Sequence, residues 1–109
     1  MISSSYEGPS GWTFLTNHTH VLLCIARDPE ARLRDVAGLV GITERATQRI
    51  LADLVASGYV SRQRVGRRNS YALVPDLPLR HPLERQCAVG TLLSALGTRP
   101  ARQDPTPGS

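Results

Sequence analysis

Four arginines in one short segment have the clearest chemistry in this chain. Arg62, Arg64, Arg67 and Arg68 lie within residues 60–75, where no acidic residue occurs, so the segment's charge of +4 equals the net charge of the whole chain. A guanidinium group is planar, permanently charged and suited to phosphate and guanine edges. Such a segment suits contact with phosphate or with the negative potential of a narrow minor groove. A solvated arginine-rich turn with no partner is the alternative.

The residues around these arginines have the pattern of a β-hairpin. Residues 59–65 and 70–74 are short runs of alternating character, and Gly66-Arg67-Arg68-Asn69 between them has turn chemistry at both ends. The sequence therefore predicts two strands joined by a turn that presents Arg67, Arg68 and Asn69 to a partner.

A helix is predicted just before this hairpin, over residues 43–57. Thr43 can cap its N-terminus, Glu44 complements the helix dipole, and Gly58 ends it in a left-handed conformation. Spacings of three and four place one set of side chains inward, namely Thr47, Ile50, Leu51 and Leu54. The outward set is Glu44, Arg45, Gln48, Arg49 and Ala52. Arg45, Gln48 and Arg49 are candidates for base readout and Thr43 for phosphate contact.

Two more helices are expected upstream. The first begins at Thr16 or Asn17, either of which could cap it, and ends at Arg27 before an Asp-Pro exit. A short strand over residues 32–34 is predicted to pair with the hairpin. The second helix is predicted from residue 34 or 35 to residue 40, with an inward set of Val36, Ala37, Leu39 and Val40.

A fourth helix is predicted from Pro82 to about Leu96, and its apolar positions cover more than half of its circumference. Leu23 lies nearly opposite the apolar face of the first helix, so both terminal helices have apolar surface to cover. We therefore expect a dimer interface. Its members are Leu23, Leu83, Cys87, Val89, Leu92, Leu93 and Leu96. The alternative is that the fourth helix folds over its own domain and leaves some apolar surface exposed.

Length and composition bound the possibilities. A chain of 109 residues forms one domain, with no room for a separate sensing domain. The expected organisation is a flexible arm (1–11), the main domain (12–80), the terminal helix (81–97) and a disordered tail (98–109). No apolar run could span a membrane and the N-terminus lacks signal-peptide features, which predicts a cytoplasmic protein.

The run from Leu33 to Arg62, closed by Gly66-Arg67-Arg68-Asn69, resembles winged helix-turn-helix transcriptional regulators of the MarR and ArsR type. The resemblance covers about residues 15–75. It implies a mainly α fold with a small β-hairpin: a three-helix core plus wing, here with an additional C-terminal helix. It also implies that helix 43–57 enters a major groove of double-stranded DNA and that the wing, residues 60–74, touches backbone or minor groove.

The chain departs from that family pattern at two points. It is shorter than typical MarR-type proteins, which dimerise through long terminal helices, and Thr47 stands where an aliphatic residue is usual. The first departure leaves the dimer geometry open, and the second indicates a looser core contact. The resemblance does not specify the operator or any effector.

Other chemistry is weakly supported. Cys24 and Cys87 could form a redox switch, and with His18, His20 and His81 they could be assembled into a metal site, but no paired ligand spacing is present. We expect neither a metal nor another cofactor. Catalytic motifs are absent, so an enzyme is not expected. A winged helix used for protein interaction is the rival to a sequence-specific, homodimeric DNA-binding regulator.

Overall fold

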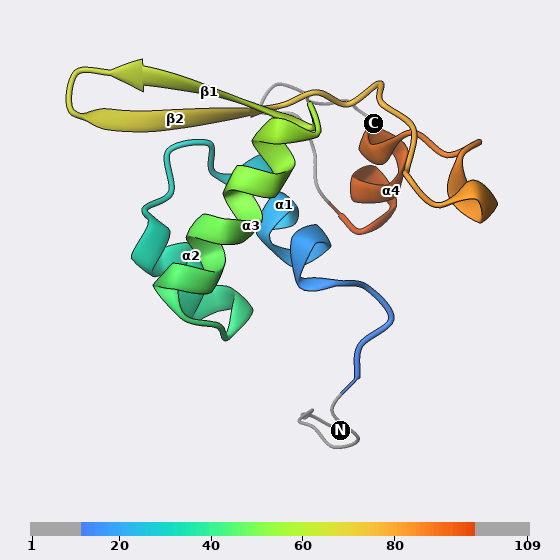
Figure 1. Ribbon diagram of the computed structural model, residues 1–109, viewed down its shortest axis with the longest axis horizontal. Helices are drawn as coiled ribbons and strands as arrows, with labels where there is room; N and C mark the ends of the chain where they lie inside the picture. The colour runs from blue at the N-terminus through green and yellow to red at the C-terminus, as the bar shows by residue number, and fades with distance from the viewer. Residues whose placement is uncertain (1–11, 98–109) are drawn as a thin grey trace.

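Three helices and a hairpin surround the core, and a fourth helix closes one side of it (Figure 1). The structure is a computed structural model that describes residues 12–97; the predicted arm (1–11) and tail (98–109) lie outside the described residues. Its elements, in chain order, are α1 (Asn17–Arg27), α2 (Leu33–Val40), α3 (Glu44–Ala56), β1 (Val60–Val65), β2 (Arg68–Leu73), a 3-10 helix (Pro82–Glu84) and α4 (Val89–Ala95).

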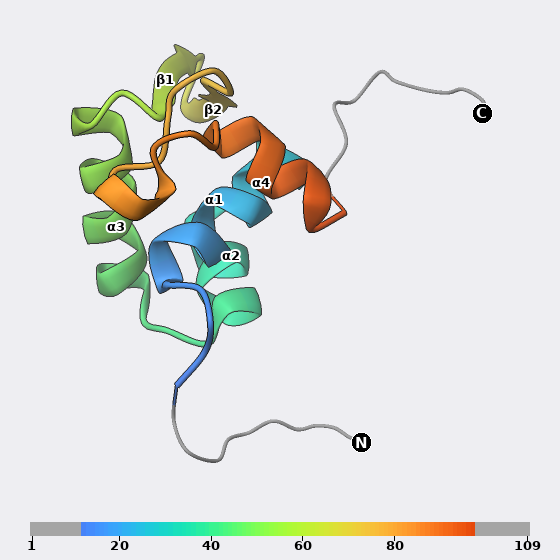
Figure 2. The same cartoon turned by 90° about the vertical axis from the view of Figure 1, so that its right-hand side faces the viewer.

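One hydrophobic core joins these elements. α1 lies between α3 and α4 in Figure 2, with α2 below it. The core side chains come from every helix and from the start of the hairpin, so burial of apolar surface holds the elements together. They are Val21, Leu22, Ile25, Val36, Ile50, Leu51, Leu54, Tyr59, Val60, Val89 and Leu93.

Threonine caps begin α1 and α3, as predicted. Thr16 Oγ1 accepts a hydrogen bond from the Thr19 N–H, and Thr43 Oγ1 accepts one from the Ala46 N–H at 3.0 Å. Each cap satisfies a backbone donor that has no partner inside the helix. The four residues predicted to face inward from α3, including Thr47, are all buried.

The C-terminus of α3 directs the chain into the hairpin. Gly58 has φ +87°, the Gly58 N–H donates to the Val55 carbonyl, and the Tyr59 N–H donates to the Leu54 carbonyl at 3.0 Å. This pair of bonds is the Schellman motif, in which the left-handed residue is usually glycine. The predicted helix end at Gly58 is thus confirmed, and Tyr59 enters the core.

The hairpin is confirmed, but its turn is shorter than predicted. Val65 pairs with Arg68, so only Gly66 and Arg67 form the turn, and Arg68 and Asn69 belong to β2. Gly66 has φ +64°, which two-residue hairpin turns require of their first position. The backbone twist of such a two-residue turn matches the right-handed twist of the two strands, which favours this tight connection.

Two predictions around α2 were wrong. Residues 32–34 form no strand, because α2 already begins at Leu33; instead, the Pro29 carbonyl accepts a single hydrogen bond from the Tyr71 N–H on the free edge of β2. Leu39 was assigned to the core but is 77% exposed. The inward face of this short helix consists of Val36 and Ala37, which are buried, with Leu33 and Val40 packed against the core beside them.

The predicted continuous helix from Pro82 to Leu96 was also wrong. The Val89 N–H donates to the Leu77 carbonyl and the Leu79 N–H donates to the Cys87 carbonyl, with a β-bridge between Pro78 and Ala88. These groups pair across a loop, so they cannot continue a helix. The helical part is therefore split into the 3-10 helix Pro82–Glu84 and α4.

Splitting the helix changes the predicted dimer interface. Val89 and Leu93 are only 3% and 1% exposed, because α4 packs on its own domain. They cannot contact a partner, and their assignment to a dimer interface is corrected. Among the predicted interface residues, Leu83 is 82% exposed and Leu96 is 36% exposed.

The order of helices and the antiparallel hairpin after α3 define a winged helix-turn-helix fold. α2 and α3 are joined by a turn at Gly41, which has φ +88° and ends α2. Within residues 12–97, no helix has the length and apolar character that crossing a membrane requires.

Candidate nucleic-acid interface

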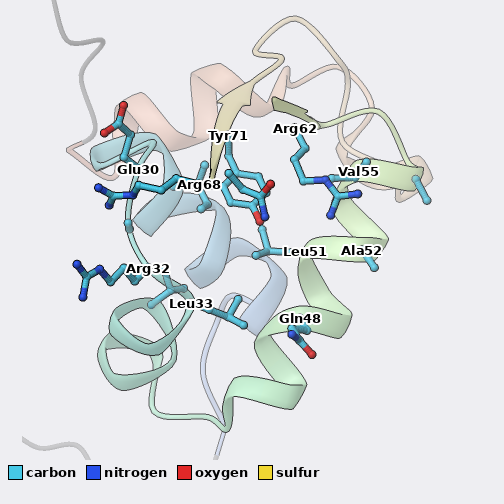
Figure 3. Close-up of a pocket in the computed structure, with 15 residues that line it drawn as sticks. Glu30, Arg32, Leu33, Gln48, Leu51, Ala52, Val55, Arg62, Arg68 and Tyr71 are labelled. Atoms are coloured by element: carbon cyan, nitrogen blue, oxygen red, sulfur yellow. The ribbon is translucent and has the colours of Figure 1, made fainter. Parts of the chain in front are cut away.

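A groove of about 790 Å³ separates α3 from the hairpin (Figure 3). Leu51 and Val55 of α3 form one wall of it, Tyr71 and Arg62 of the hairpin form another, and Leu33 of α2 closes its end. The floor is apolar, whereas the rim carries arginine, glutamine and asparagine side chains. An elongated polar partner that follows this groove would contact α3 and the wing together.

Strand register explains how the hairpin enters the groove. Arg62 pairs with Tyr71 and Arg64 pairs with Asn69, and side chains of directly paired residues share one face of a sheet. Val60 lies on the same face and is buried against the core. The face with Arg62 and Tyr71 is therefore the one turned toward α3.

The groove gathers some of the predicted DNA-binding residues and leaves others outside. Gln48, Arg62, Arg68 and Asn69 line it. The remaining six are exposed but do not line it: Thr43, Glu44, Arg45, Arg49, Arg64 and Arg67. Thr43 uses its hydroxyl as the cap of α3.

The exposed side of α3 continues the groove. Arg45, Gln48, Arg49 and Ala52 are all exposed and lie three and four residues apart, so they share one side of the helix. Gln48 and Ala52 also line the groove. A partner in the groove would thus extend onto Arg45 and Arg49.

Sequence reasoning missed Arg32 and Glu30. Arg32 precedes α2, makes no side-chain capping bond, and lines the groove with Glu30 (Figure 3). The bend between α1 and α2 brings Arg32 and Glu30 beside the hairpin, and no local sequence pattern predicts this. Tyr71 was likewise unassigned; its N–H is held by the Pro29 carbonyl at 3.0 Å.

The groove has an excess of free positive charge. Arg32, Arg62 and Arg68 line it together with a single carboxylate, that of Glu30. Across residues 12–97 the only ion pair joins His18 Nε2 to Asp53 Oδ2, at 2.9 Å, so none of these arginines is paired with a carboxylate there. Unpaired guanidinium groups remain available for an anionic partner.

The cysteines do not form a reactive pair in this structure. Both are free thiols, and the Cys87 thiol donates to the Ala88 carbonyl at 3.4 Å. Burial raises the pKa of the Cys24 thiol, and nearby Arg27 only partly opposes this. The thiolate is the reactive form, so this environment lowers the reactivity of Cys24. Among the described residues, no group of three or more histidine, cysteine or acidic side chains could hold a metal ion.

The fold and groove together define a helix-turn-helix domain with a basic wing. Residues 15–64 match the family model described as the IclR helix-turn-helix domain, from just before α1 to the end of β1. This match indicates a winged helix-turn-helix transcription regulator. The MarR or ArsR type predicted from the sequence is not confirmed, because IclR is a different family. Comparison with curated proteins gave no significant match.

Proposed function

We propose that this protein binds duplex DNA in a sequence-specific manner and regulates transcription as a cytoplasmic homodimer. The observation that carries the proposal is the groove between α3 and the hairpin, which is lined by Arg32, Arg62 and Arg68, none of them ion-paired among residues 12–97. The exposed side chains of Arg45, Gln48 and Arg49 lie on α3 beside it. The match to a helix-turn-helix family model supports the same class. The proposed activity is binding, without a catalytic step.

In the proposed complex, α3 lies in a major groove. Arg45, Gln48 and Arg49 read base edges, because arginine matches the guanine O6 and N7 atoms and glutamine matches adenine. Glu44, in the first turn, is next to them and can accept from cytosine. Thr43 keeps its role as the helix cap, and its backbone stands close to where a phosphate would lie.

The hairpin and the start of α2 hold the DNA backbone. Arg32, Arg62 and Arg68 line the groove and would contact phosphates of the strand that passes between α3 and the wing. Arg64, Arg67 and Asn69 lie at or next to the turn of the hairpin, where they would contact backbone or minor groove; Asn69 also lines the groove.

The dimer is proposed from exposed apolar side chains near the C-terminal end of the domain. Leu83 is 82% exposed and Leu96 is 36% exposed. Leu23, Cys87 and Leu92 are half-buried and are the other members of the proposed interface. Exposed apolar patches often mark association sites, and a two-fold dimer would place two α3 helices on one palindromic site.

Selection of bound sequences from a random duplex pool tests the proposal. We expect an enriched palindrome whose half-sites are about one helical turn apart, since that spacing mirrors two recognition helices of a dimer. Enrichment should be lost in Arg45→Ala but retained in Arg85→Ala. Arg85 is a suitable control because its segment lies at the opposite end of the molecule from the hairpin tip (Figure 1). Binding without any enriched sequence would overturn the proposal.

A second candidate function is protein interaction. Trp12 is 67% exposed and Phe14 is 92% exposed, and their rings meet edge to face with centroids 5.2 Å apart. Exposed aromatic anchors are typical of protein interfaces. This function is favoured if the selection yields no motif, binding disappears as salt rises, and the protein is a monomer.

A further inference from the structure

A second hollow lies on the other flank of α3. It holds about 330 Å³ and is formed by α1, by the C-terminal end of α3 and by residues 79–92. Gln48 and Ala52 line the groove between α3 and the hairpin, whereas Asp53 and Ser57 line this hollow. The two sites therefore lie on opposite sides of α3. Figure 2 looks onto this side, with the loop that contains the 3-10 helix in front.

The interior of the hollow is apolar. Leu22, Leu54 and Val89 are buried, and Leu79 and Leu92 are half-buried around them. Tyr59 also lines the hollow, but its hydroxyl already donates to the Pro78 carbonyl. The interior therefore suits a branched or aromatic hydrocarbon group, and its volume is at the lower end for small-molecule sites.

The rim carries one cation, one anion and one neutral donor. Arg80 and Glu84 both line the hollow, and neither has an ion-pair partner in the described part of the chain. His81 Nδ1 accepts from the Leu83 N–H at 3.0 Å, so the neutral ring carries its proton on Nε2 and can donate from there. Two further polar side chains on the rim, His18 and Asp53, already contact each other through Nε2 and Oδ2 at 2.9 Å.

We propose that this hollow binds a small zwitterion with an apolar side chain, an α-amino acid of the leucine or phenylalanine type. The ligand carboxylate would lie between Arg80 and His81, its ammonium at Glu84, and its side chain over Leu22 and Leu54. The unpaired opposite charges on the rim are complementary to a zwitterion, and a simple acid or amine would leave one of them without a partner.

A ligand here would touch the recognition helix directly. Asp53, Leu54 and Ser57 belong to the last turns of α3 or its cap, and the His18–Asp53 pair ties α3 to α1 at the edge of the hollow. Binding would therefore change the position or mobility of α3, and with it the affinity for DNA. This regulatory step rests on the proposed function, whereas ligand binding itself does not.

Calorimetric and NMR titrations of the full chain, without DNA, test the site. The probes are leucine and phenylalanine at up to about 5 mM, together with 4-methylpentanoate and 3-methylbutylamine, which each lack one of the two charges. We expect saturable shifts at residues of the hollow for at least one amino acid, with binding by the single-charge analogues weaker by about ten-fold or more.

Variants distinguish a built site from a nonspecific one. Arg80→Gln and Glu84→Gln should each weaken binding by about ten-fold or more, whereas Arg85→Gln, on the same segment but outside the hollow, should not change it. Unshifted hollow residues for both amino acids would overturn the proposal. Equal binding of 4-methylpentanoate, unaffected by Glu84→Gln, would overturn the zwitterion assignment. Because no DNA is present, failure here is separate from failure of the proposed function.

Discussion

Some polar side chains of this domain satisfy its backbone, whereas others are free for a partner. Thr43 and Thr16 cap helices, and the Tyr59 hydroxyl binds the Pro78 carbonyl, so these polar groups are used internally. Arg67, at the hairpin turn, is exposed and has no ion-pair partner among residues 12–97. Substitution should affect the first group through stability and the second through binding.

Arg67→Ala should weaken DNA binding at all sequences alike. A lost phosphate contact reduces the number of released counterions, so the slope of log K against log salt should fall in magnitude by about one. Binding isotherms at several salt concentrations measure this slope. Arg85→Ala is the matched control and should leave it unchanged; an unchanged slope in Arg67→Ala would remove the wing from the interface.

Thr47→Val should leave stability unchanged or raise it by up to about 1 kcal/mol. Thr47 is fully buried, and its hydroxyl donates to the Thr43 carbonyl at 2.9 Å. That carbonyl also accepts from the Thr47 N–H, so the substitution leaves no acceptor unpaired. Thr47→Ser, which keeps the hydroxyl and loses the methyl, should cost about 1 kcal/mol. Urea unfolding measures the stability of both variants. The prediction would be wrong if Thr47→Val destabilised the domain more than Thr47→Ser.

Cys24 should react slowly with iodoacetamide in the native protein. Burial raises the pKa of its thiol, so less thiolate is present near pH 8 than in the unfolded chain. Because the folded state holds this proton more tightly, stability should fall as the pH rises from the unfolded pKa through the folded one. Mass spectrometry in native and denaturing buffer compares the rates. Equal rates would show that the thiol is not protected.

Between elements, one close approach decides how α4 sits on the hairpin. The Gly90 N–H donates to the Pro75 carbonyl at 2.9 Å, near the start of α4 and just after β2. A Cβ at residue 90 would lie 2.6 Å from Pro75 Cβ and 2.9 Å from its carbonyl oxygen. The contact exists only because residue 90 has no side chain.

Gly90→Ala should therefore destabilise the domain by about 1–3 kcal/mol, because α4 would have to move away from Pro75. Gly38→Ala is the matched control: Gly38 lies in α2, and a Cβ there meets nothing within 4 Å. Alanine at 38 should raise stability by about 0.5–1 kcal/mol, since it is the better helix former. Chemical unfolding of both variants tests the contrast, which would fail if the two substitutions had similar effects.

At the scale of the whole molecule, the proposed DNA contacts and the proposed dimer contacts lie at different ends. The hairpin and α2 lie at one end in Figure 1, and the loop with the 3-10 helix lies at the other. A partner subunit that contacts Leu83 would leave the α3 groove open. The proposed dimer is therefore compatible with the proposed DNA contacts.

Leu83→Gln should shift the protein toward monomer and reduce the affinity for a palindromic site. Removing an interface anchor typically costs about 1–2 kcal/mol or more. Sedimentation velocity over a range of concentrations measures this equilibrium. Leu39→Gln is the control, because Leu39 is also highly exposed, at 77%, but lies on α2. A wild-type protein that sediments only as a monomer would rule out the dimer.

Much of the fold could be predicted because its signals are local. Thr16, Thr43 and Gly58 mark the helix boundaries through bonds within a few residues, and the periodicity of residues 47–54 identifies the buried face of α3. The alternating residues 59–65 and 70–74, with turn residues between them, also predict the hairpin. These features depend on neighbours in the chain, so the sequence by itself determined them.

Tertiary structure alone decided what depends on distant partners. The predicted fourth helix breaks because Leu77 and Leu79 pair with Val89 and Cys87, an exchange of hydrogen bonds that no local pattern contains. Arg32 joins the groove only because the α1–α2 bend brings it beside the hairpin. Apolar periodicity predicts that one face of a helix will be buried, but only the packed fold determines what buries it. The apolar face of α4 is buried against the core of its own domain.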